Sequence, residues 1–290
     1  MPAMEINKVL LTIVMPVYNA EQYIEKALLN IAAQTFRNYE LLVLDALSED
    51  STKAIIEVKQ RTDPRITLVS ESDNGIYEAM NKGIEKAKGE WIYFMGSDDD
   101  FFNADVLQNF SGSLNNENDI VYGDVLWVPD NIMESGECTP RFLLNRNINH
   151  QRIFYRKALF EQWGSYDLQY KVASDHELNI RFFCNNSIRK QYIPLTVARY
   201  HSGGYSANKL DEVFWENWKP IFQKNFSLHL SLKEMYSKLG WYCRYQTEKH
   251  NYAKAFVLFW DVFLHTFSLG FVKLTFNHFI KSLRTGAALI

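Results

Sequence analysis

The stretch DNGIYEAMNKGIEKAKGEWIYFMGSDDD, residues 73–100, contains a helical pattern, then an apolar run, then three aspartates. Its first part carries apolar or small residues at i, i+3, i+4, i+7, i+8 and i+11, the spacing of one helix face: Ile76, Ala79, Met80, Gly83, Ile84 and Ala87. The run Trp91–Met95 is apolar throughout, as expected of a strand buried on both sides. Adjacent carboxylates repel one another, so we expect the three aspartates to face a cation that offsets their charge.

The same alternation of strands and helices occurs in the residues before this stretch. Apolar runs typical of buried strands lie at Val9–Met15, Tyr39–Asp45 and Arg65–Ser70, and helical patterns lie at residues 21–35 and Ser51–Gln60. This alternation predicts an α/β fold in which a mostly parallel sheet is covered by helices. Because Val9–Met15 lacks a basic leader and a small-residue cleavage site, we interpret it as a strand and not as a signal peptide.

Polar residues follow each expected strand at the point where it ends. They are Pro16–Tyr18, Asp45, Glu71–Asn74 and Ser97–Asp100. Ligands of open parallel sheets bind outside the carboxyl ends of the strands, so we expect these residues to line one site. Carboxylate oxygens suit Mg²⁺ or Mn²⁺, which makes Asp98 and Asp99 candidate metal ligands. The alternative is that Ser97, Asp98 and Asp99 only begin the next helix, where aspartate is favoured.

Composition and charge exclude several classes of protein. The chain has 290 residues, 47% of them hydrophobic, which is enough for one sizeable core and a smaller appendage. Residues 209–290 carry 11 Lys or Arg and 6 Asp or Glu; this net charge of +5 leaves −8 for residues 1–208, because the whole chain carries −3. A nucleic-acid binder would show a concentrated basic stripe instead. The three cysteines form no CxxC pattern, which argues against zinc or a disulfide framework. No stretch of the sequence is both long enough and free enough of charged residues to span a bilayer, and we expect a cytoplasmic protein.

Three segments of the chain carry a resemblance to a known family. They are TIVMPVYNAEQYIEKAL, YELLVLD and SESDNGIYEAMNKGIEKAKGEWIYFMGSDD. Over about residues 9–206 the chain resembles the inverting family 2 glycosyltransferases of bacterial polysaccharide synthesis. The resemblance implies a GT-A fold in residues 1–206, with a nucleotide-binding half at about 1–102 and an acceptor half at about 103–206. It also implies a nucleotide-diphosphate sugar donor, a divalent metal at a DxD-type motif and one catalytic carboxylate.

The resemblance assigns roles to residues of the expected donor site. Pro16, Val17 and Tyr18 match the loop that lines the nucleoside, Asp45 matches the aspartate that reads the base, typically uracil, and Asp73 and Lys82 match the segment flanking the nucleotide. Ser97, Asp98 and Asp99 match the acidic motif, in which Asp98 and Asp99 are implied to hold Mn²⁺ or Mg²⁺. The chain departs from the family at two places. Many members have Asp-Asp-Gly-Ser or Asp-Gly-Gly-Ser where this chain has Asp45-Ala46-Leu47-Ser48, and Gly96 stands where a first aspartate often lies.

The segment ASDHELNIRF, residues 173–182, contains the candidate catalytic base. Ser174 and Glu177 have the spacing of a capping box at the start of a helix. Asp175 has two interpretations. In the first turn of a helix it could simply complement the helix dipole, whereas the resemblance implies that it is the general base that deprotonates the acceptor hydroxyl. We favour the base, with Glu177 second.

The run RYHSGGYS, residues 199–206, also matches the family. His201 is implied to be a third metal ligand or a contact of the diphosphate, and Gly203 and Gly204 would let backbone amides approach phosphate oxygens. The alternative is an ordinary loop histidine beside a turn.

From residue 207 to 290 the pattern becomes helical. One apolar stripe is formed by Phe256, Phe259, Trp260, Phe263, Leu264 and Phe267. We expect a small helical bundle; the alternative is an interfacial helix with Lys254, Lys273, Lys281 and Arg284 near lipid headgroups, which would suit a lipid-linked acceptor. Peripheral membrane contact is the most that this pattern predicts.

The leading hypothesis is a metal-dependent, inverting transfer of a sugar from a UDP-sugar to a glycan or lipid-linked oligosaccharide. Two alternatives remain open. A nucleotidyltransferase making sugar nucleotides would need a Gly-rich loop with a basic residue after its first strand, where this chain has PVYNAEQ. A non-catalytic partner subunit would keep the fold, but it would not need Asp98, Asp99 and Asp175.

Overall fold

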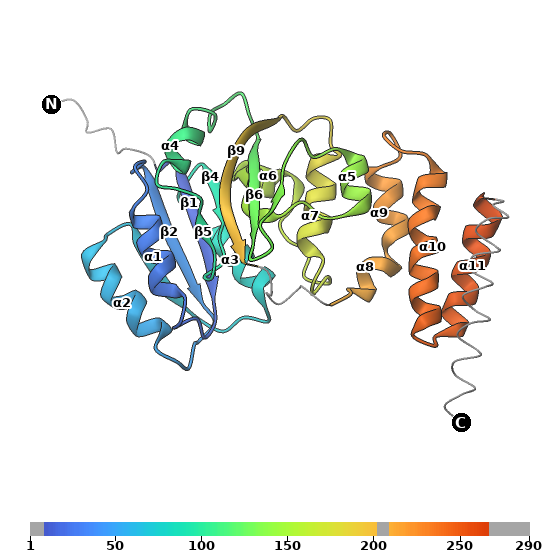
Figure 1. Cartoon of the computed structure of the whole chain (residues 1–290), viewed down its shortest axis with the longest axis horizontal. Helices are drawn as coiled ribbons and strands as arrows, with labels where there is room; N and C mark the ends of the chain where they lie inside the picture. Colours follow the sequence, from blue (N-terminus) through green and yellow to red (C-terminus); the bar gives the residue numbers. More distant parts are fainter. Residues whose placement is uncertain (1–8, 202–208, 267–290) are drawn as a thin grey trace. The chain divides into compact units, whose positions relative to one another are not determined.

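The computed structural model describes residues 9–201 and 209–266 (Figure 1). Contacts within the chain divide it into two compact units. The first comprises residues 1–138 and 148–210, and the second comprises residues 139–147 and 211–290. Gly203 and Gly204, and the helical pattern expected after Thr266, lie outside the described residues.

The strands of the described residues form one nine-stranded sheet in the order β3-β2-β1-β4-β8-β6-β9-β5, with β7 paired to β6. Four neighbouring strands are parallel to one another, as the alternation of the sequence predicts: β3 (Ile66–Ser70), β2 (Tyr39–Asp45), β1 (Leu11–Val17) and β4 (Trp91–Phe94). The other strands are β8 (Ile153–Arg156), β6 (Ile120–Val128), β9 (Lys190–His201), β5 (Asp100–Phe101) and β7 (Ile132–Glu134). In that part of the sheet β6 and β9 are parallel, while β8 is antiparallel to both β4 and β6.

Helices cover this sheet. Those of the first unit are α1 (Ile24–Ala32), α2 (Thr52–Thr62), α3 (Ile76–Lys86), α4 (Val106–Ser111), α6 (Ala158–Trp163), α7 (Ser174–Phe183) and the short 3-10 helix η1 (His150–Arg152). The helix predicted from residue 76 packs against β1 through Gly83, where a Cβ atom would lie only 2.3 Å from Cγ1 of Val14. A glycine therefore lets α3 approach the sheet closely.

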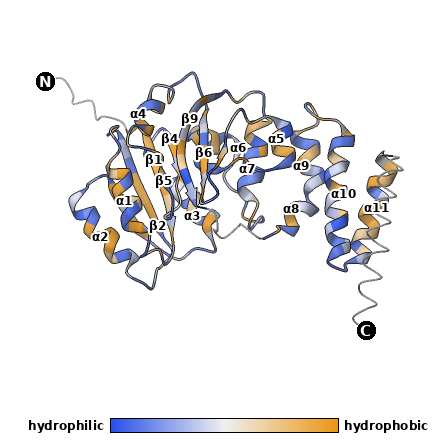
Figure 2. Cartoon of the chain, viewed as in Figure 1, coloured by the Kyte–Doolittle hydropathy of each residue, from blue (hydrophilic) through white to orange (hydrophobic). Residues whose placement is uncertain are grey.

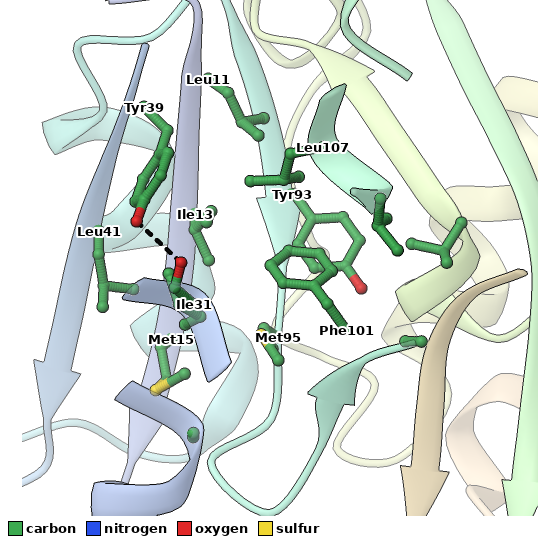
Figure 3. Packing of buried hydrophobic residues seen from close by; sticks show 14 of the residues in the cluster. Leu11, Ile13, Met15, Ile31, Tyr39, Leu41, Tyr93, Met95, Phe101 and Leu107 are labelled. Carbon is green, nitrogen blue, oxygen red and sulfur yellow. Dashed lines mark hydrogen bonds between the residues drawn. The ribbon is translucent and has the colours of Figure 1, made fainter. Parts of the chain in front are cut away.

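The core of the first unit contains residues of the parallel strands, of α1 and of α4 (Figure 3). The successive residues Ile13, Val14 and Met15 of β1 are fully buried, as expected of a strand covered on both faces. The hydroxyl of Tyr39 donates a 2.9 Å hydrogen bond to the carbonyl of Ile31, so this buried phenol keeps a polar partner (Figure 3).

The three aspartates do not begin a helix. Asp100 starts strand β5, which pairs antiparallel with Arg199 and Ala198 of β9, and the next helix begins only at Val106. The interpretation of Ser97–Asp99 as a helix start is therefore wrong. The chain turns back into the sheet directly after the carboxylates, and this turn holds them beside the end of β9.

The second unit is helical, as expected for the C-terminal region. Its helices are α5 (Pro140–Asn145), α8 (Glu212–Glu216), α9 (Trp218–Asn225), α10 (Leu232–Glu248) and α11 (Tyr252–Thr266). Aromatic side chains form its core, with Trp218, Phe222 and Tyr242 fully buried. Figure 2 shows the apolar character of α11, on which Phe256, Val257, Trp260 and Leu264 are exposed. Within residues 9–201 and 209–266, none of the helices combines the length and the apolar character that crossing a membrane requires.

Candidate active site

The loops after β1 and β2 interlock at the carboxyl edge of the sheet. The carbonyl of Val17 accepts a 3.0 Å hydrogen bond from the amide of Ala46, and the amide of Asn19 donates one of 2.9 Å to Oγ of Ser48. Val17 is buried in the core, Pro16 is half-buried, and Tyr18 is 59% exposed. Of the three residues assigned to the nucleoside, Tyr18 therefore presents most of its side chain at this edge.

Asp45, at the end of β2, is held by its neighbours. It is only 1% exposed. Its Oδ1 accepts from the amide of Ser48 at 3.1 Å, and its Oδ2 accepts from the hydroxyl of Ser70 at 2.7 Å. The carboxylate thus ties the end of β2 to β3 while lying beside the exposed loop that follows.

Asp73 and Lys82 lie on either side of the start of α3. Oδ1 of Asp73 accepts a 2.9 Å hydrogen bond from the amide of Gly75. The Lys82 ammonium donates to the carbonyl of Ser72 at 2.6 Å and lies near the carboxylates of Glu71 and Glu78, at 3.6 and 3.3 Å. Lys82 therefore stabilises the segment that leads from β3 into α3 through these contacts.

A cavity of ≈ 350 Å³ lies where the aspartate run meets α1 and the end of β9. Its lining residues are Tyr23, Lys26, Ala27, Ser97, Asp98, Asp99 and His201. Asp100 is engaged by cations instead, with Nη1 of Arg199 at 2.8 Å and Nζ of Lys26 at 3.5 Å. The three consecutive aspartates consequently have different surroundings, and only two of them line the cavity.

Asp99 is the most buried of the three, at 3% exposure. Its Oδ1 accepts a 2.7 Å hydrogen bond from the amide of His201, and its Oδ2 accepts from Nε2 of Gln151. Burial, and after it the neighbouring charge of Asp98, raises the pKa of Asp99 to about 7, although the hydrogen bonds from His201 and Gln151 act to lower it. A negative charge at this position is therefore costly unless a cation compensates it.

The chemistry of these side chains fits a divalent cation. Asp98 and Asp99 offer hard oxygen ligands, and Nδ1 of His201 is a buried nitrogen with no hydrogen-bond partner among the described residues, 3.7 Å from Oδ1 of Asp99. Among the described residues, no three His, Cys, Asp or Glu side chains lie close enough together to hold a metal ion on their own. Two carboxylates with substrate phosphates completing the coordination are the usual arrangement for Mg²⁺.

Asp175 lies in the first turn of α7 and is held from α3. Its Oδ1 accepts a 2.9 Å hydrogen bond from the hydroxyl of Tyr77 and one of 2.8 Å from the amide of His176. The capping box predicted for Ser174 and Glu177 is wrong, because neither side chain caps the helix.

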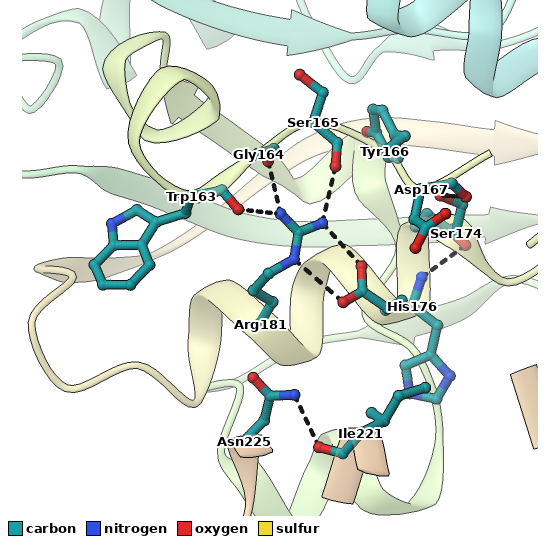
Figure 4. Close-up of polar contacts among 12 residues, drawn as sticks. Trp163, Gly164, Ser165, Tyr166, Asp167, Ser174, His176, Arg181, Ile221 and Asn225 are labelled. Atoms are coloured by element: carbon teal, nitrogen blue, oxygen red, sulfur yellow. Dashed lines mark hydrogen bonds and ion pairs between the residues drawn. The ribbon is translucent and has the colours of Figure 1, made fainter. Parts of the chain in front are cut away.

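Other hydrogen bonds and an ion pair replace that capping box, as Figure 4 shows around α7. The Ser174 hydroxyl donates to the carbonyl of Asp167 at 2.8 Å, and the Glu177 carboxylate pairs with Arg181 at 2.8 Å. The guanidinium of Arg181 also donates to the carbonyls of Gly164 and Ser165, which fixes the loop before α7. Glu177 is thus committed to a structural ion pair, and Asp175 is the acidic residue of this turn that remains as the candidate base.

Tyr200, on β9, is affected by the charges of both groups of carboxylates. Burial, followed by the charges of Asp99, Asp98 and Asp175 in that order, raises its pKa to about 12. All three carboxylates therefore lie within electrostatic range of one hydroxyl on β9. Sequence reasoning assigned no role to Tyr200, whose only signal was its position next to His201 in the run RYHSGGYS, and it missed the contact of Gln151 with Asp99.

Comparisons with known proteins show the family and the fold of the chain. Residues 12–193 match the family described as Glycosyl transferase family 2. A PGL/p-HBAD biosynthesis glycosyltransferase of Mycobacterium bovis (strain BCG / Pasteur 1173P2) is 36% identical over 208 residues, covering 70% of this chain and 81% of the relative. A protein of the same description from Mycobacterium tuberculosis (strain ATCC 25177 / H37Ra) is also 36% identical over 208 residues.

Solved structures share the fold. S. aureus TarS 1-349 in complex with UDP-GlcNAc superposes with a TM-score of 0.64 at 20% identity, covering 81% of each chain. The mannosyltransferase PcManGT from Pyrobaculum calidifontis, in complex with GDP-Man and Mn2+, superposes with a TM-score of 0.54 at 19% identity, covering 96% of this chain and 79% of that chain.

The curled α/β sheet, the polar site at its carboxyl edge and these matches define an enzyme of the GT-A fold that transfers a glycosyl group. The chain belongs to glycosyl transferase family 2. The expected fold and enzyme class are confirmed, and this membership decides against the nucleotidyltransferase and the non-catalytic subunit.

Proposed function

We propose that this enzyme transfers a sugar, with inversion, from a UDP-sugar to a hydroxyl of a glycan or lipid-linked oligosaccharide in bacterial surface polysaccharide synthesis. The observation that supports the proposal is that Asp98, Asp99 and His201 line one cavity at the end of the aspartate run. The charges of Asp99, Asp98 and Asp175 all act on Tyr200, so a pair of carboxylates suited to a cation and a separate candidate base are near the same residue of β9. Displacement of a diphosphate by a hydroxyl requires both kinds of group. The UDP-GlcNAc complex of TarS and the biosynthetic description of the mycobacterial relatives support the donor and the pathway class.

The donor binds at the carboxyl edge of the parallel strands. Tyr18 and the neighbouring Pro16 and Val17 line the nucleoside, with Asp45 at the base and Asp73 and Lys82 flanking the nucleotide. Ser97 and Asp98 lie at the diphosphate. Asp98, Asp99 and His201 hold Mn²⁺ or Mg²⁺, which when bound supplies positive charge that stabilises the diphosphate leaving group. A Mn2+ complex of PcManGT supports this choice of metal.

The transfer is a single displacement. The acceptor oxygen forms a bond to the anomeric carbon on the face opposite the diphosphate, and the bond from that carbon to the phosphate oxygen breaks. Asp175 accepts the proton of the acceptor hydroxyl, and the electron pair leaves with the diphosphate. No covalent intermediate with the enzyme forms, so the anomeric configuration inverts.

We assign donor binding to residues 1–102 and the base with the acceptor site to residues 103–206. Of the remaining region, 207–290, the described residues 209–266 are mostly helical. The exposed apolar residues Phe256, Val257, Trp260 and Leu264 of α11 support peripheral contact with the inner face of the cytoplasmic membrane, where a lipid-linked acceptor would lie. Lys254 is engaged by Glu216 at 2.6 Å, so this contact does not depend on that lysine.

Hydrolysis of UDP-sugars in the presence of Mn²⁺ tests the proposal. Wild-type protein is expected to release UDP from at least one UDP-sugar, and the rate is expected to rise when the correct acceptor is added. Asp175→Asn is expected to lower kcat for transfer about 10²–10⁴-fold while UDP still binds, because only proton removal is lost. Absence of turnover and of metal-dependent UDP or GDP binding in the wild type would reject the proposal.

A further inference from the structure

Leu47, in the loop after β2, has a backbone conformation that leucine rarely adopts. Its φ is 58°, in the left-handed region. Among the described residues the other non-glycine positions with positive φ are Asn19, Asn131 and His250, residue types that tolerate this region comparatively well. Leucine has no polar group with which to compensate, so its backbone is strained at this site.

The loop does not need the leucine side chain in order to form. Its backbone is held on both sides of Leu47, by the bond from Ala46 to Val17 and by the bond from Asn19 to Ser48. The amide of Glu49 also donates to Oδ1 of Asn19 at 2.9 Å. A glycine at position 47 would keep all of these contacts and would relieve the strain, because glycine adopts positive φ readily.

The side chain is also not buried. Leu47 is 52% exposed, and Tyr18, in the loop that interlocks with it, is 59% exposed. Two large apolar side chains are thus left in solvent at the carboxyl ends of β1 and β2, beside the buried carboxylate of Asp45. Neither strain nor exposure favours folding, and residues kept in such conformations cluster at ligand sites.

We propose that Leu47 is a contact residue for the nucleoside of the donor. Together with Tyr18 it covers the base and ribose of a nucleoside diphosphate, and the apolar surface of both side chains is buried when the nucleotide binds. This inference rests on the proposed function, because it assigns the ligand to the same edge of the sheet. Leu47 stands where many members of the family have the glycine of Asp-Asp-Gly-Ser, so the assignment gives a function to this departure.

Titration of UDP in the presence of Mn²⁺, followed by calorimetry, tests the assignment. Leu47→Gly and Leu47→Ala are expected to weaken UDP binding about three- to tenfold, the effect of losing roughly half of a leucine's buried surface. The melting temperature of the unliganded Leu47→Gly protein is expected to stay unchanged or to rise, since its strain is relieved. Val58→Ala is the matched control: Val58 is 56% exposed on α2, and its truncation is expected to leave UDP affinity unchanged.

Three outcomes would overturn the assignment. If Leu47→Gly binds UDP with wild-type affinity, Leu47 does not contact the nucleoside, and the proposed function is unaffected. A loss of affinity accompanied by a fall in melting temperature of several degrees in Leu47→Gly would show that the leucine supports the loop instead. If the wild type binds neither UDP nor GDP, the proposed function fails and this assignment fails with it.

Discussion

The hydroxyl of Tyr77 in α3 donates a 2.9 Å hydrogen bond to Oδ1 of Asp175 in α7, across 98 residues of sequence. The same hydroxyl lies 2.8 Å from the carbonyl of Val172. A hydroxyl has one hydrogen, and a carboxylate accepts it more strongly than a carbonyl does. Tyr77 therefore links the helix of the donor half to the candidate base.

A second contact supports this link. Asn81, one helical turn after Tyr77, exchanges two hydrogen bonds with the backbone of Tyr166, at 2.9 and 3.0 Å. The ring of Tyr166 stacks on that of Tyr77, with centroids 5.4 Å apart. One face of α3 thus fixes the loop that leads to α7, which explains the role of Tyr77 and Asn81 in the segment DNGIYEAMN.

Tyr77→Phe is expected to lower kcat about tenfold with little change in KM for the donor. Loss of a hydrogen bond to the ionised form raises the pKa of a carboxylate, so the acidic limb of the kcat profile is expected to move up by about one pH unit. The measurement is kcat against pH for both proteins.

Tyr166→Phe is the matched control for that prediction. The hydroxyl of Tyr166 is buried and has no hydrogen-bond partner among the described residues, so its removal leaves the stacked ring in place. We expect an unchanged pH profile. An equal shift of the acidic limb in both variants would contradict a specific role of the Tyr77 hydroxyl.

Asp100→Asn is expected to destabilise the fold without removing metal-dependent UDP binding. The substitution weakens the ion pair with Arg199 at 2.8 Å beside the core, and losing such a charged contact typically costs about 1–3 kcal/mol. Urea denaturation measures the change. Lys26→Met is the control: Lys26 is mostly exposed and 3.5 Å from Asp100, so a change of at most about 1 kcal/mol is expected. Loss of metal dependence in Asp100→Asn at full stability would show that this aspartate belongs to the metal site.

Stability is expected to decrease as the pH falls from about 6.5 towards 4, partly because of His150. Burial lowers the pKa of His150 to about 4, below the ordinary 6.5. The unfolded chain therefore takes up a proton first, and stability that is fully present above pH 6.5 is lost progressively below it. Between pH 7.5 and 5 this contribution amounts to about 1–2 kcal/mol.

The measurement is urea denaturation of wild type and His150→Gln at both pH values. The variant is expected to lose less stability on acidification. Equal losses in the two proteins would show that His150 does not contribute to the pH dependence.

The parallel part of the fold was predictable from the sequence because its signals are local. Apolar runs such as Trp91–Met95 and the helical spacing from Ile76 onward require no knowledge of distant residues. The rest of the sheet and the surroundings of Asp99 depend on pairing between residues that are far apart in the sequence. Gln151 reaches Asp99 across 52 residues and His201 reaches it across 102, and no short pattern specifies either contact.

The failed capping box has a different cause, the competition of other nearby partners. Ser174 and Glu177 have the correct spacing, but the Ser174 hydroxyl donates to the carbonyl of Asp167, and Glu177 pairs with Arg181 four residues further along α7. The position of Asp175 in the first turn of α7 was predictable. Its hydrogen bond from Tyr77 was not.

The affinity for UDP, measured with Mn²⁺ and with excess EDTA in wild type and in Asp98→Asn, tests whether a divalent cation at Asp98 and Asp99 holds the donor. We predict that wild-type protein binds UDP at least about tenfold more tightly with Mn²⁺, and that Asp98→Asn abolishes this difference while remaining folded. UDP binding that is equally tight with Mn²⁺, with EDTA and in Asp98→Asn would show that these carboxylates do not bind the donor through a metal ion.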